Sequence, residues 1–349
     1  MKRFSILIAA LCLCLTGCGK QTTEATAQIF AMDTVMEVAA YGEHAEQAVK
    51  YTEKRIEELE NRLSRTKADS LVSGLNRDGS IRHLTYDYWN LIARAKEYRD
   101  ATNGAFDITI APVMDAWGFT GDQFRVPEQS ELNELLKHVN SDEIQVQEEP
   151  SYSVTLGEGQ AIDLGGIAKG YTSDLVEQTF RANGIESGKI SLGGNVFVLG
   201  GKPDGSDWRV GIKDPRNESG LAAILSLRDA YAITSGGYER YFEENGKTYH
   251  HIIDPSTGYP ADSGLLSVTV VAADNGPDWA GAGNGAMCDA FSTALFVMGE
   301  EQALDFWRNG GYDFDLVLVT EDGRVVITAG LADRFEEVKD SGYTYETVS

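Results

Sequence analysis

The segment Ala161–Phe180 reads AIDLGGIAKGYTSDLVEQTF, and its hydrophobic period changes in the middle. Ile162 and Leu164 flank Asp163 in a short apolar alternation, which predicts a strand. Two glycines then interrupt the alternation, and apolar residues recur at helical spacing after them. The sequence therefore predicts a strand that turns tightly into a helix. The helical apolar positions are Ile167, Tyr171, Leu175 and Val176.

The turn in this segment is a candidate anion site. A strand-to-helix turn directs backbone N–H groups and the positive end of the helix dipole at one point. The Lys169 ammonium follows within one turn, and Asp163 is a hydrogen-bond acceptor beside it. An ordinary corner, in which Gly165 and Gly166 only permit close packing, fits the same residues. Both a pyrophosphate site and a packing corner therefore remain open at this point.

The N-terminus predicts export. Two basic residues precede an apolar run, Phe4–Leu15, whose length suits a signal peptide and is too short for a membrane span. The tetrapeptide LTGC that ends at Cys18 resembles the bacterial lipoprotein cleavage box, which implies cleavage before Cys18 and lipidation of its sulfur. We expect a signal peptide over 1–17, a lipidated cysteine and polar linker over 18–28, and a lipid anchor on the extracytoplasmic face of the cell membrane.

Charge and cysteine content exclude several classes of site. The formal net charge is −24, and removal of the two basic signal residues takes it to about −26. This charge disfavours binding to nucleic acid or to anionic lipid headgroups, so an anionic ligand requires a local positive group or a metal ion. Cys288 is the one thiol left after signal cleavage and lipidation of Cys18. An internal disulfide and a cysteine-rich zinc site are therefore excluded.

The pattern of elements predicts an α+β fold. Consecutive short strands with few long helices between them are typical of antiparallel sheet. We expect antiparallel or mixed β-sheets with surrounding helices, in a single large domain of two packed lobes over 29–335. A charged, frayed tail is expected over 336–349. The expected helices are Glu43–Leu63, Tyr86–Arg99, Val126–Val139 and Asp289–Met298, and the expected strands include Ile29–Tyr41, Ala105–Ile110 (ended by Pro112), two pieces within Ile190–Leu199, Trp208–Ile212, Ala222–Leu227, Tyr231–Thr234, Leu265–Ala272, Leu316–Val319 and Val325–Thr328.

Three residues, Asp289, Thr293 and His251, suggest catalytic chemistry. Asp289 and Thr293 are four residues apart, so on a helix their oxygens share one face and suit Mg²⁺. Alternatively, Asp289 is an N-cap and Thr293 bonds back to its own helix. His251 precedes a proline-stiffened turn, and a neutral imidazole there can take a proton from a hydroxyl nucleophile. A structural hydrogen-bond donor is the other interpretation of His251. Trp117 and Phe119 are either core residues or a stacking surface for a flavin or adenine ring.

Seven short blocks occur in one order along the chain. Each is modest alone, but the ordered series resembles that of the ApbE-type FAD:protein FMN transferases from about Phe30 to Gly330. The blocks are AMDT (31–34), GAFD (104–107), IDLGGIAKGY (162–171), LGGN (192–195), TSG (234–236), HIIDPSTG (251–258) and DAFSTAL (289–295).

The resemblance implies a role for individual residues. It implies that Mg²⁺ is held by the carbonyl of Gly166, the carboxylate of Asp289 and the hydroxyl of Thr293, and that His251 is the base. Where the family often has an aromatic residue against the flavin, after Leu63-Ser64-Arg65, this chain has Thr66, so that wall of the flavin site departs from the family. The implied FAD contacts are Met32, Ala105, Phe106, Asp107, Asp163, Lys169 and Ile252.

The implied activity is a Mg²⁺-dependent FAD:protein FMN transferase. It would cleave the FAD pyrophosphate, attach FMN through a phosphoester to a threonine of an exported acceptor protein and release AMP. The acceptor would be an FMN-binding domain or a redox-pump subunit. With water as acceptor, the same site would be a FAD pyrophosphatase that gives FMN and AMP. A flavin-binding lipoprotein without catalysis is disfavoured, because storage does not require Asp289, Thr293 and His251 together.

Overall fold

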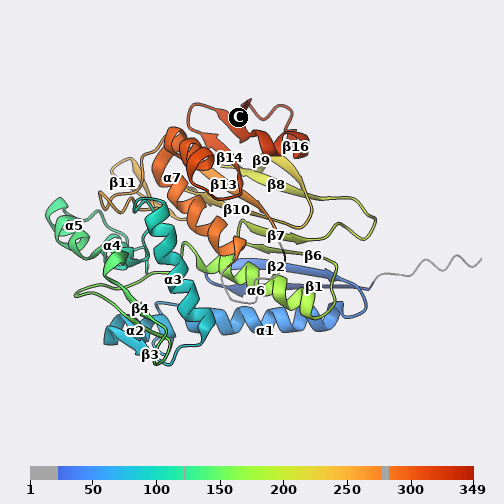
Figure 1. Ribbon diagram of the computed structural model, residues 1–349. Coiled ribbons are helices and arrows are strands. Elements are labelled where there is room, and N and C mark those ends of the chain that lie inside the picture. Colours follow the sequence, from blue (N-terminus) through green and yellow to red (C-terminus); the bar gives the residue numbers. More distant parts are fainter. Residues whose placement is uncertain (1–22, 122, 275, 277–282) are drawn as a thin grey trace, which may run out of the picture.

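A nine-stranded mixed sheet forms the centre of the molecule (Figure 1). The computed structural model describes residues 23–121, 123–274, 276 and 283–349. Neighbouring strands run antiparallel except β15 and β17, which are parallel, so the predicted α+β class with mixed sheet is confirmed. In spatial order the strands are β1 (Glu24–Ala31), β2 (Thr34–Tyr41), β6 (Ser187–Leu192), β7 (Asn195–Leu199), β10 (Ala230–Gly236), β13 (Leu265–Ala273), β14 (Asp315–Thr320), β15 (Arg324–Thr328) and β17 (Thr344–Val348).

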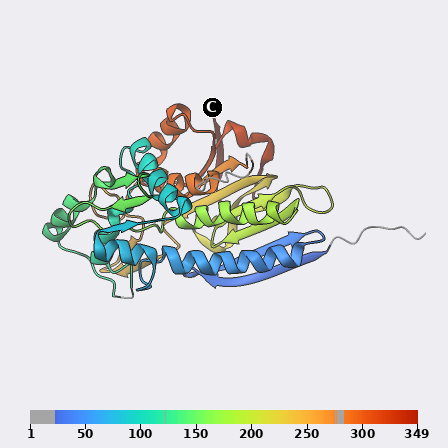
Figure 2. The ribbon, with the colours of Figure 1, turned by 60° about the horizontal axis from the view of Figure 1, so that its bottom comes forward.

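Helices cover one face of this sheet, and a small second sheet covers part of the other. Three long helices form the helical layer: α1 (Ala45–Leu63), α6 (Ala168–Ala182) and α7 (Asn284–Asn309). Figure 2 shows α1 and α6 running side by side over the strands. The second sheet consists of β8 (Trp208–Asp214), β9 (Asn217–Leu227) and β16 (Phe335–Glu337). One apolar core lies beneath the helices, and a separate core, which includes Trp208, Leu225 and Val317, lies between the sheets.

A smaller lobe lies at one end of the sheet, on the left of Figure 1. Its core surrounds Trp117, whose Nε1 donates to the carbonyl of Gly258 at 2.7 Å. Trp117 and Phe119 are both fully buried, so of the two interpretations of these residues the structure supports core packing. The elements that contribute side chains to this core are α4 (Ala111–Trp117), α5 (Gln129–Leu135), β11 (Tyr241–Glu244) and β12 (Lys247–His250), with the short 3₁₀ helices η1 (Ile108–Ile110) and η2 (Leu136–His138). The other elements at this end are α2 (Leu71–Asp78), α3 (Tyr86–Ala101), β3 (Ser80–Arg82), β4 (Gln145–Gln147), β5 (Ser153–Thr155) and η3 (Ser141–Glu143), and the apolar side chains of these helices and strands pack in the core beneath the long helices.

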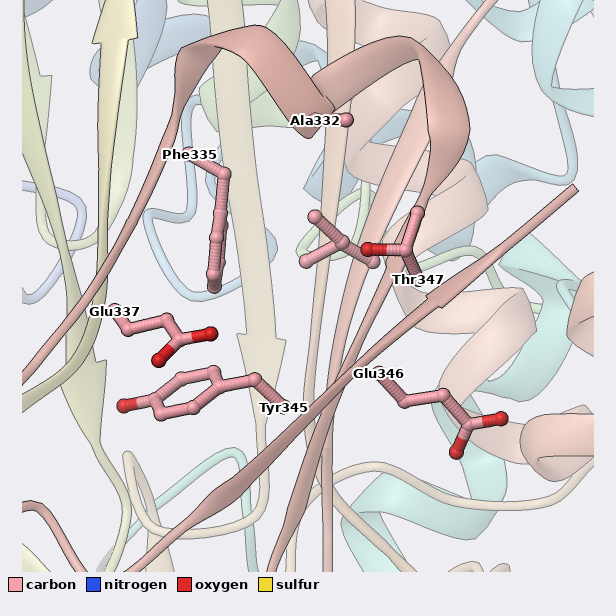
Figure 3. Close-up of a pocket in the computed structure, with 7 residues that line it drawn as sticks. Ala332, Phe335, Glu337, Tyr345, Glu346 and Thr347 are labelled. Carbon is pink, nitrogen blue, oxygen red and sulfur yellow. The ribbon is translucent and has the colours of Figure 1, made fainter.

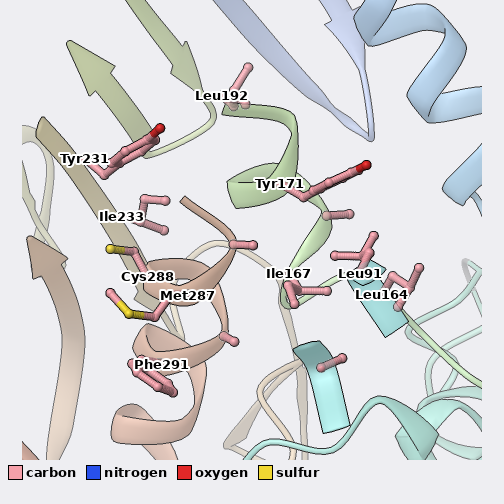
Figure 4. Close-up of a cluster of buried hydrophobic side chains, with 14 of the residues drawn as sticks. Leu91, Leu164, Ile167, Tyr171, Leu192, Tyr231, Ile233, Met287, Cys288 and Phe291 are labelled. Atoms are coloured by element: carbon pink, nitrogen blue, oxygen red, sulfur yellow. The ribbon is translucent and has the colours of Figure 1, made fainter. Parts of the chain in front are cut away.

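The helical periodicities locate the buried faces correctly. On α1 the apolar stripe that includes Ile56 and Leu59 is buried, whereas its charged residues face solvent. The predicted apolar positions of α6 are buried too, and most of its remaining residues are buried because α1, α7 and the sheet surround it. In Figure 4, Tyr171 of α6 lies on the side of Leu91, whereas Cys288 of α7 lies beside Ile233.

The predicted single strand Ile29–Tyr41 is wrong, because it is a hairpin. Met32 and Asp33 have φ of +50° and +58° and form the two-residue turn between β1 and β2. Positive φ at both turn positions matches the right-handed twist of the paired strands. In addition, β1 begins at Glu24, so residues 24–28, assigned to the linker, belong to the sheet.

Two more predicted strands are absent from the described structure. Residues 105–107 are irregular and continue into η1 and α4, because Asp107 caps η1 and Pro112 occupies the first turn of α4. Proline suits that position, since it has no N–H to leave unpaired there. Residues 161–164 form no strand. Instead, the side chain of Asn76 bonds both the N–H and the carbonyl of Ile162, at 2.7 and 2.9 Å.

Several helix boundaries and the C-terminal tail also differ from the expectation. Helix α7 begins at Asn284, so Asp289 lies inside the helix and is not its N-cap. The predicted helix Val126–Val139 is shortened to α5 and η2. The tail, expected to be frayed, contains β17, which pairs with β15 in the main sheet. No helix in the described part of the chain is long and apolar enough to cross a bilayer. The predicted signal peptide and Cys18 lie outside the described residues.

Helices α6 and α7 cross in backbone contact, and this crossing positions the candidate site. A Cβ added to Gly170 would lie 2.1 Å from the carbonyl oxygen of Gly285, and one added to Gly285 would lie 2.4 Å from that of Gly170. One turn after its glycine, each helix carries an aspartate that caps the first turn of the other helix. Asp289 of α7 accepts from the N–H of Gly170, and Asp174 of α6 accepts from three N–H groups at the start of α7.

The crossing predicts that Gly170→Ala destabilises the protein. Backbone atoms cannot move aside as a flexible side chain does, so we expect a loss of about 1–3 kcal/mol in the free energy of unfolding. Gly74→Ala is the matched control, because Gly74 is also helical and its added Cβ would contact only the end of Arg77, at 3.8 Å. Urea denaturation measures both variants. Equal midpoints for the two variants would contradict the prediction.

Candidate active site

Asp289 is a buried carboxylate held by amide donors. It is 3% exposed, and its Oδ2 accepts from the N–H of Gly170 at 2.8 Å. Its Oδ1 accepts from Nδ2 of Asn195, the first residue of β7, at 3.1 Å. Both donors are uncharged, so the negative charge of Asp289 is not neutralised by these bonds. A buried carboxylate with only uncharged donors is stabilised by a nearby cation.

Thr293, Gly166 and Phe106 meet beside Asp289. Thr293 lies one turn after Asp289 on α7, and a Cβ placed on Gly166 would lie 3.3 Å from Thr293 Oγ1 and 3.2 Å from the Phe106 ring. Gly166 belongs to the turn before α6, more than a hundred residues from Thr293 in the chain. The structure therefore brings together the three residues proposed to hold Mg²⁺, with donor atoms from two segments.

The donor set fits a hard cation. Carboxylate, hydroxyl and carbonyl oxygens are the groups that Mg²⁺ prefers, with water and substrate phosphate completing its shell. Oδ1 of Asn195 is fully buried and has no hydrogen-bond partner, although Nδ2 of the same amide bonds Asp289. An unpaired buried acceptor beside a buried carboxylate fits a site that binds a cation. Within the described residues, no group of three or more His, Cys, Asp or Glu side chains could hold a metal ion, so this candidate site depends on hydroxyl and carbonyl oxygens beside the Asp289 carboxylate.

His251 and His250 are adjacent in sequence but differ in their hydrogen bonds. His250 uses both ring nitrogens, because Nε2 lies 3.0 Å from the carbonyl of Ala261 and Nδ1 accepts from the N–H of Ile252. His251 uses Nδ1, which lies 3.1 Å from the carbonyl of Arg240. A carbonyl only accepts, so Nδ1 of His251 carries the proton. This tautomer leaves the lone pair of Nε2 available as a base.

The surroundings keep His251 neutral. Its pKa is lowered to about 4, mainly because the ring is removed from water; the bond to the Arg240 carbonyl raises the pKa, and the Lys169 ammonium lowers it. The influence of Lys169 places its positive charge close to His251. Ile252, the next predicted FAD contact, is buried directly after the histidine. His251, Lys169 and Ile252 therefore form a second part of the candidate site.

Asp163 is held by an arginine that the sequence analysis assigned no role. Arg65 donates to Asp163 Oδ2 at 3.1 Å, to Thr120 at 2.9 Å and to Asp115 at 2.7 Å. The other oxygen of Asp163 accepts from the N–H of Gly165 at 2.8 Å. This ion pair fixes the segment that leads into α6 against the smaller lobe.

The remaining predicted FAD contacts, and Thr66, differ in burial and in their hydrogen-bond partners. Met32, in the β1–β2 turn, reaches α6, where its sulfur lies 3.9 Å from the Thr172 hydroxyl. Ala105 is half-buried beside Phe106. The carboxylate of Asp107 accepts from Thr109 and from the side chain and N–H of Ser141, so it serves the local fold. Thr66 is exposed and bonds Ser64 at 3.0 Å.

Two polar residues at the site were missed by the sequence analysis. Asn195 follows two glycines with φ of +59° and +101°, which make the tight turn between β6 and β7. Ser235 of β10 contacts the hydroxyls of Ser292 and Thr293. Both lie in blocks quoted above, LGGN and TSG, but only the tertiary structure shows their contacts with α7.

A cavity of about 230 Å³ lies elsewhere, near the C-terminus (Figure 3). Phe335 and Tyr345 flank it, with Glu337 between their rings in Figure 3. None of the predicted site residues lines it. This cavity is therefore separate from the candidate active site.

We expect His251 to remain neutral at physiological pH. In protein labelled with ¹⁵N in the histidine rings, its Nε2 should show an unprotonated signal down to about pH 5, with His251→Gln assigning the resonance. The unfolded ring titrates near 6.5, so lowering the pH from there toward 4 protonates only the unfolded state. The free energy of unfolding therefore decreases as the pH falls from about 6.5 toward 4. An imidazolium signal at pH 6 would contradict the prediction.

Comparisons with known proteins agree with this geometry. The model of the ApbE family matches residues 32–316. A FAD:protein FMN transferase of Treponema pallidum (strain Nichols) is 32% identical over 307 residues, which cover 83% of this chain and 82% of the relative. A FAD:protein FMN transferase of Klebsiella pneumoniae (strain 342) is 33% identical over 294 residues, with coverage of 82% and 86%.

Solved structures show the same fold. The crystal structure of the ApbE protein of Thermotoga maritima matches with a TM-score of 0.78 at 30% identity, and covers 91% of this chain and 97% of its own. The apo form of the flavinyl transferase ApbE of Pseudomonas stutzeri matches with a TM-score of 0.74 at 26% identity, with coverage of 91% and 95%. Because the family model spans most of the chain and relatives above 30% identity cover over four-fifths of it, the protein belongs to the ApbE family.

Proposed function

We propose that this protein is a Mg²⁺-dependent FAD:protein FMN transferase. The observation that carries the proposal is the meeting of Asp289 and Thr293 with the turn at Gly166, beside a neutral histidine and the ammonium of Lys169. The names of the relatives support flavin transfer as the reaction. The acceptor is a threonine of an exported protein, an FMN-binding domain or a redox-pump subunit. Export and lipidation at Cys18 would place the enzyme on the same side of the membrane as that acceptor.

The reaction exchanges one phosphorus–oxygen bond for another. The acceptor threonine hydroxyl attacks the phosphorus on the flavin side of FAD, and its proton passes to Nε2 of His251. The bond from that phosphorus to the bridging oxygen breaks, and AMP leaves with the oxygen. Lys169 provides positive charge for the developing oxyanions, and such preorganised charge is commonly the largest contribution to catalysis.

Asp289, Thr293 and the carbonyl of Gly166 would hold the metal. When bound, Mg²⁺ supplies Lewis-acid neutralisation of the pyrophosphate oxygens. The protein contributes the fixed donor positions, because the crossing of α6 and α7 sets the distance between the Gly166 turn and the two α7 side chains. Met32, Ala105, Phe106, Asp163 and Ile252 would contact FAD, and the exposed Thr66 would leave one side of the flavin uncovered.

One assay distinguishes transfer from its alternatives. The protein is mixed with FAD, Mg²⁺ and a candidate acceptor domain, and the acceptor is weighed by mass spectrometry while AMP is measured. We expect an acceptor heavier by one FMN group and an equal amount of AMP. AMP without a mass gain would indicate a FAD pyrophosphatase, and intact bound FAD would indicate a binding protein. A chelator that leaves the transfer rate unchanged would contradict the role of Mg²⁺.

Asp289→Asn tests the charge at the centre of the site. The amide keeps an oxygen for the N–H of Gly170 but removes the negative charge, so we expect the transfer rate to fall by about 10²–10³-fold, as for loss of one well-placed electrostatic group. Asp305→Asn is the control, because Asp305 is exposed in the part of α7 that follows the helix break at Gly299. Equal rates for these two variants would exclude Asp289 from catalysis. Thermal denaturation checks that both variants are folded.

A further inference from the structure

A chain of buried hydroxyl groups connects β10 to the metal-binding face of α7. The side chain of Ser235 lies between two residues of α7, with its Oγ 2.8 Å from Ser292 Oγ and 3.2 Å from Thr293 Oγ1. Ser292 in turn donates to the carbonyl of Asp289 at 2.9 Å. Ser235 is 9% exposed, and Ser292 is fully buried. Bulk water is therefore a poor competitor for these hydrogen bonds.

The number of hydrogen atoms on these groups determines which hydroxyl donates in each hydrogen bond. Each hydroxyl has one hydrogen to donate, and a carbonyl has none. The hydrogen of Ser292 is used on the Asp289 carbonyl, so Ser235 is the donor in its bond to Ser292. That bond uses the hydrogen of Ser235, so Thr293 is the donor in its bond to Ser235. The hydrogen of Thr293 therefore points toward Ser235.

The orientation of the Thr293 hydroxyl affects cation binding. A hydroxyl coordinates a metal ion through a lone pair, and a hydrogen directed at the ion would repel it. With its hydrogen directed at Ser235, Thr293 Oγ1 keeps its lone pairs for the side that faces the Gly166 turn, where an added Cβ would lie 3.3 Å away. Because the hydrogen of Thr293 is used in the bond to Ser235, it is not available for a bond back to the helix of Thr293.

We propose that Ser235 is a positioning residue for the metal: it fixes the hydroxyl of Thr293 in the orientation that coordinates a divalent cation. The inference rests on the proposed Mg²⁺ site and adds a residue outside it. Groups that orient metal ligands in this way typically change metal affinity by 10–100-fold when removed. Ser235 itself need not touch the metal, FAD or the acceptor.

The test measures metal affinity directly. FAD-free protein is titrated with Mn²⁺, and the free ion is followed by its electron paramagnetic resonance signal. We expect Ser235→Ala to weaken Mn²⁺ binding by about 10–100-fold. Ser267→Ala is the matched control, because Ser267 is a fully buried serine of the neighbouring strand β13, opposite Gly236, and its hydroxyl has no hydrogen-bond partner in the described structure. It should bind Mn²⁺ like the wild type.

Turnover provides a second measurement that loss of folding would not reproduce. For Ser235→Ala the KM for Mg²⁺ should rise by a similar factor, while kcat at saturating Mg²⁺ and the thermal midpoint stay near the wild-type values. Ser292→Ala leaves Ser235 in place but frees its hydrogen, so it should also weaken Mn²⁺ binding. This variant keeps the test valid if Ser235→Ala does not fold.

The outcomes separate this inference from the proposed function. Wild-type Mn²⁺ affinity in both Ser235→Ala and Ser292→Ala would overturn the role of Ser235 and leave the metal site intact. A wild-type protein that does not bind Mn²⁺ would overturn the metal site and this inference together. An equal loss of affinity in Ser267→Ala would also overturn the inference, because the effect would then not depend on the hydroxyl chain.

Discussion

Two carboxylates cap each other's helices at the centre of the molecule, and the candidate site depends on this reciprocal contact. Asp289 of α7 accepts an N–H from the first turn of α6, and Asp174 of α6 accepts three N–H groups at the start of α7. Helix starts have unpaired N–H groups and a partial positive charge, so each carboxylate is stabilised where it is buried. The glycine contact between the helices permits the short distance that these bonds need.

Burial of the Asp174 and Asp289 carboxylates disfavours their charged forms, and the hydrogen bonds from backbone and side-chain amides offset part of this cost. Complete burial raises the pKa of Asp174 to about 7, although its N–H partners lower it. Asp289 accepts from two uncharged amide donors in the described part of the chain, and a cation could pair with its carboxylate. In a protein with net charge −24, a pyrophosphate needs such a local compensation. The ammonium of Lys169 and a metal at Asp289 would provide it.

Hydrophobic period predicted the long helices α1 and α6 well and the short helices and irregular segments poorly. The stripes of α1 and α6 are long, so several turns of pattern agree with one another. Short segments depend on single side chains instead. Asp107 caps a 3₁₀ helix where alternation indicated a strand, and Asn76 pairs with Ile162 in place of a neighbouring strand. Met32 and Asp33 adopt positive φ within an apolar run, a conformation that is uncommon for methionine.

The amino-acid sequence by itself determined the α+β class, the order of the seven blocks and the residue types available for metal and proton chemistry. Local order along the chain is sufficient for these properties. The tertiary structure alone decided that Asp289 is an interior helix residue and that Asn195 and Ser235 reach α7. It also decided that, among the described residues, both ring nitrogens of His250 have hydrogen-bond partners, whereas Nδ1 is the one ring nitrogen of His251 that has a partner. These are contacts between segments far apart in the chain, and side-chain hydrogen bonding at such contacts depends on distances and orientations that periodicity does not encode.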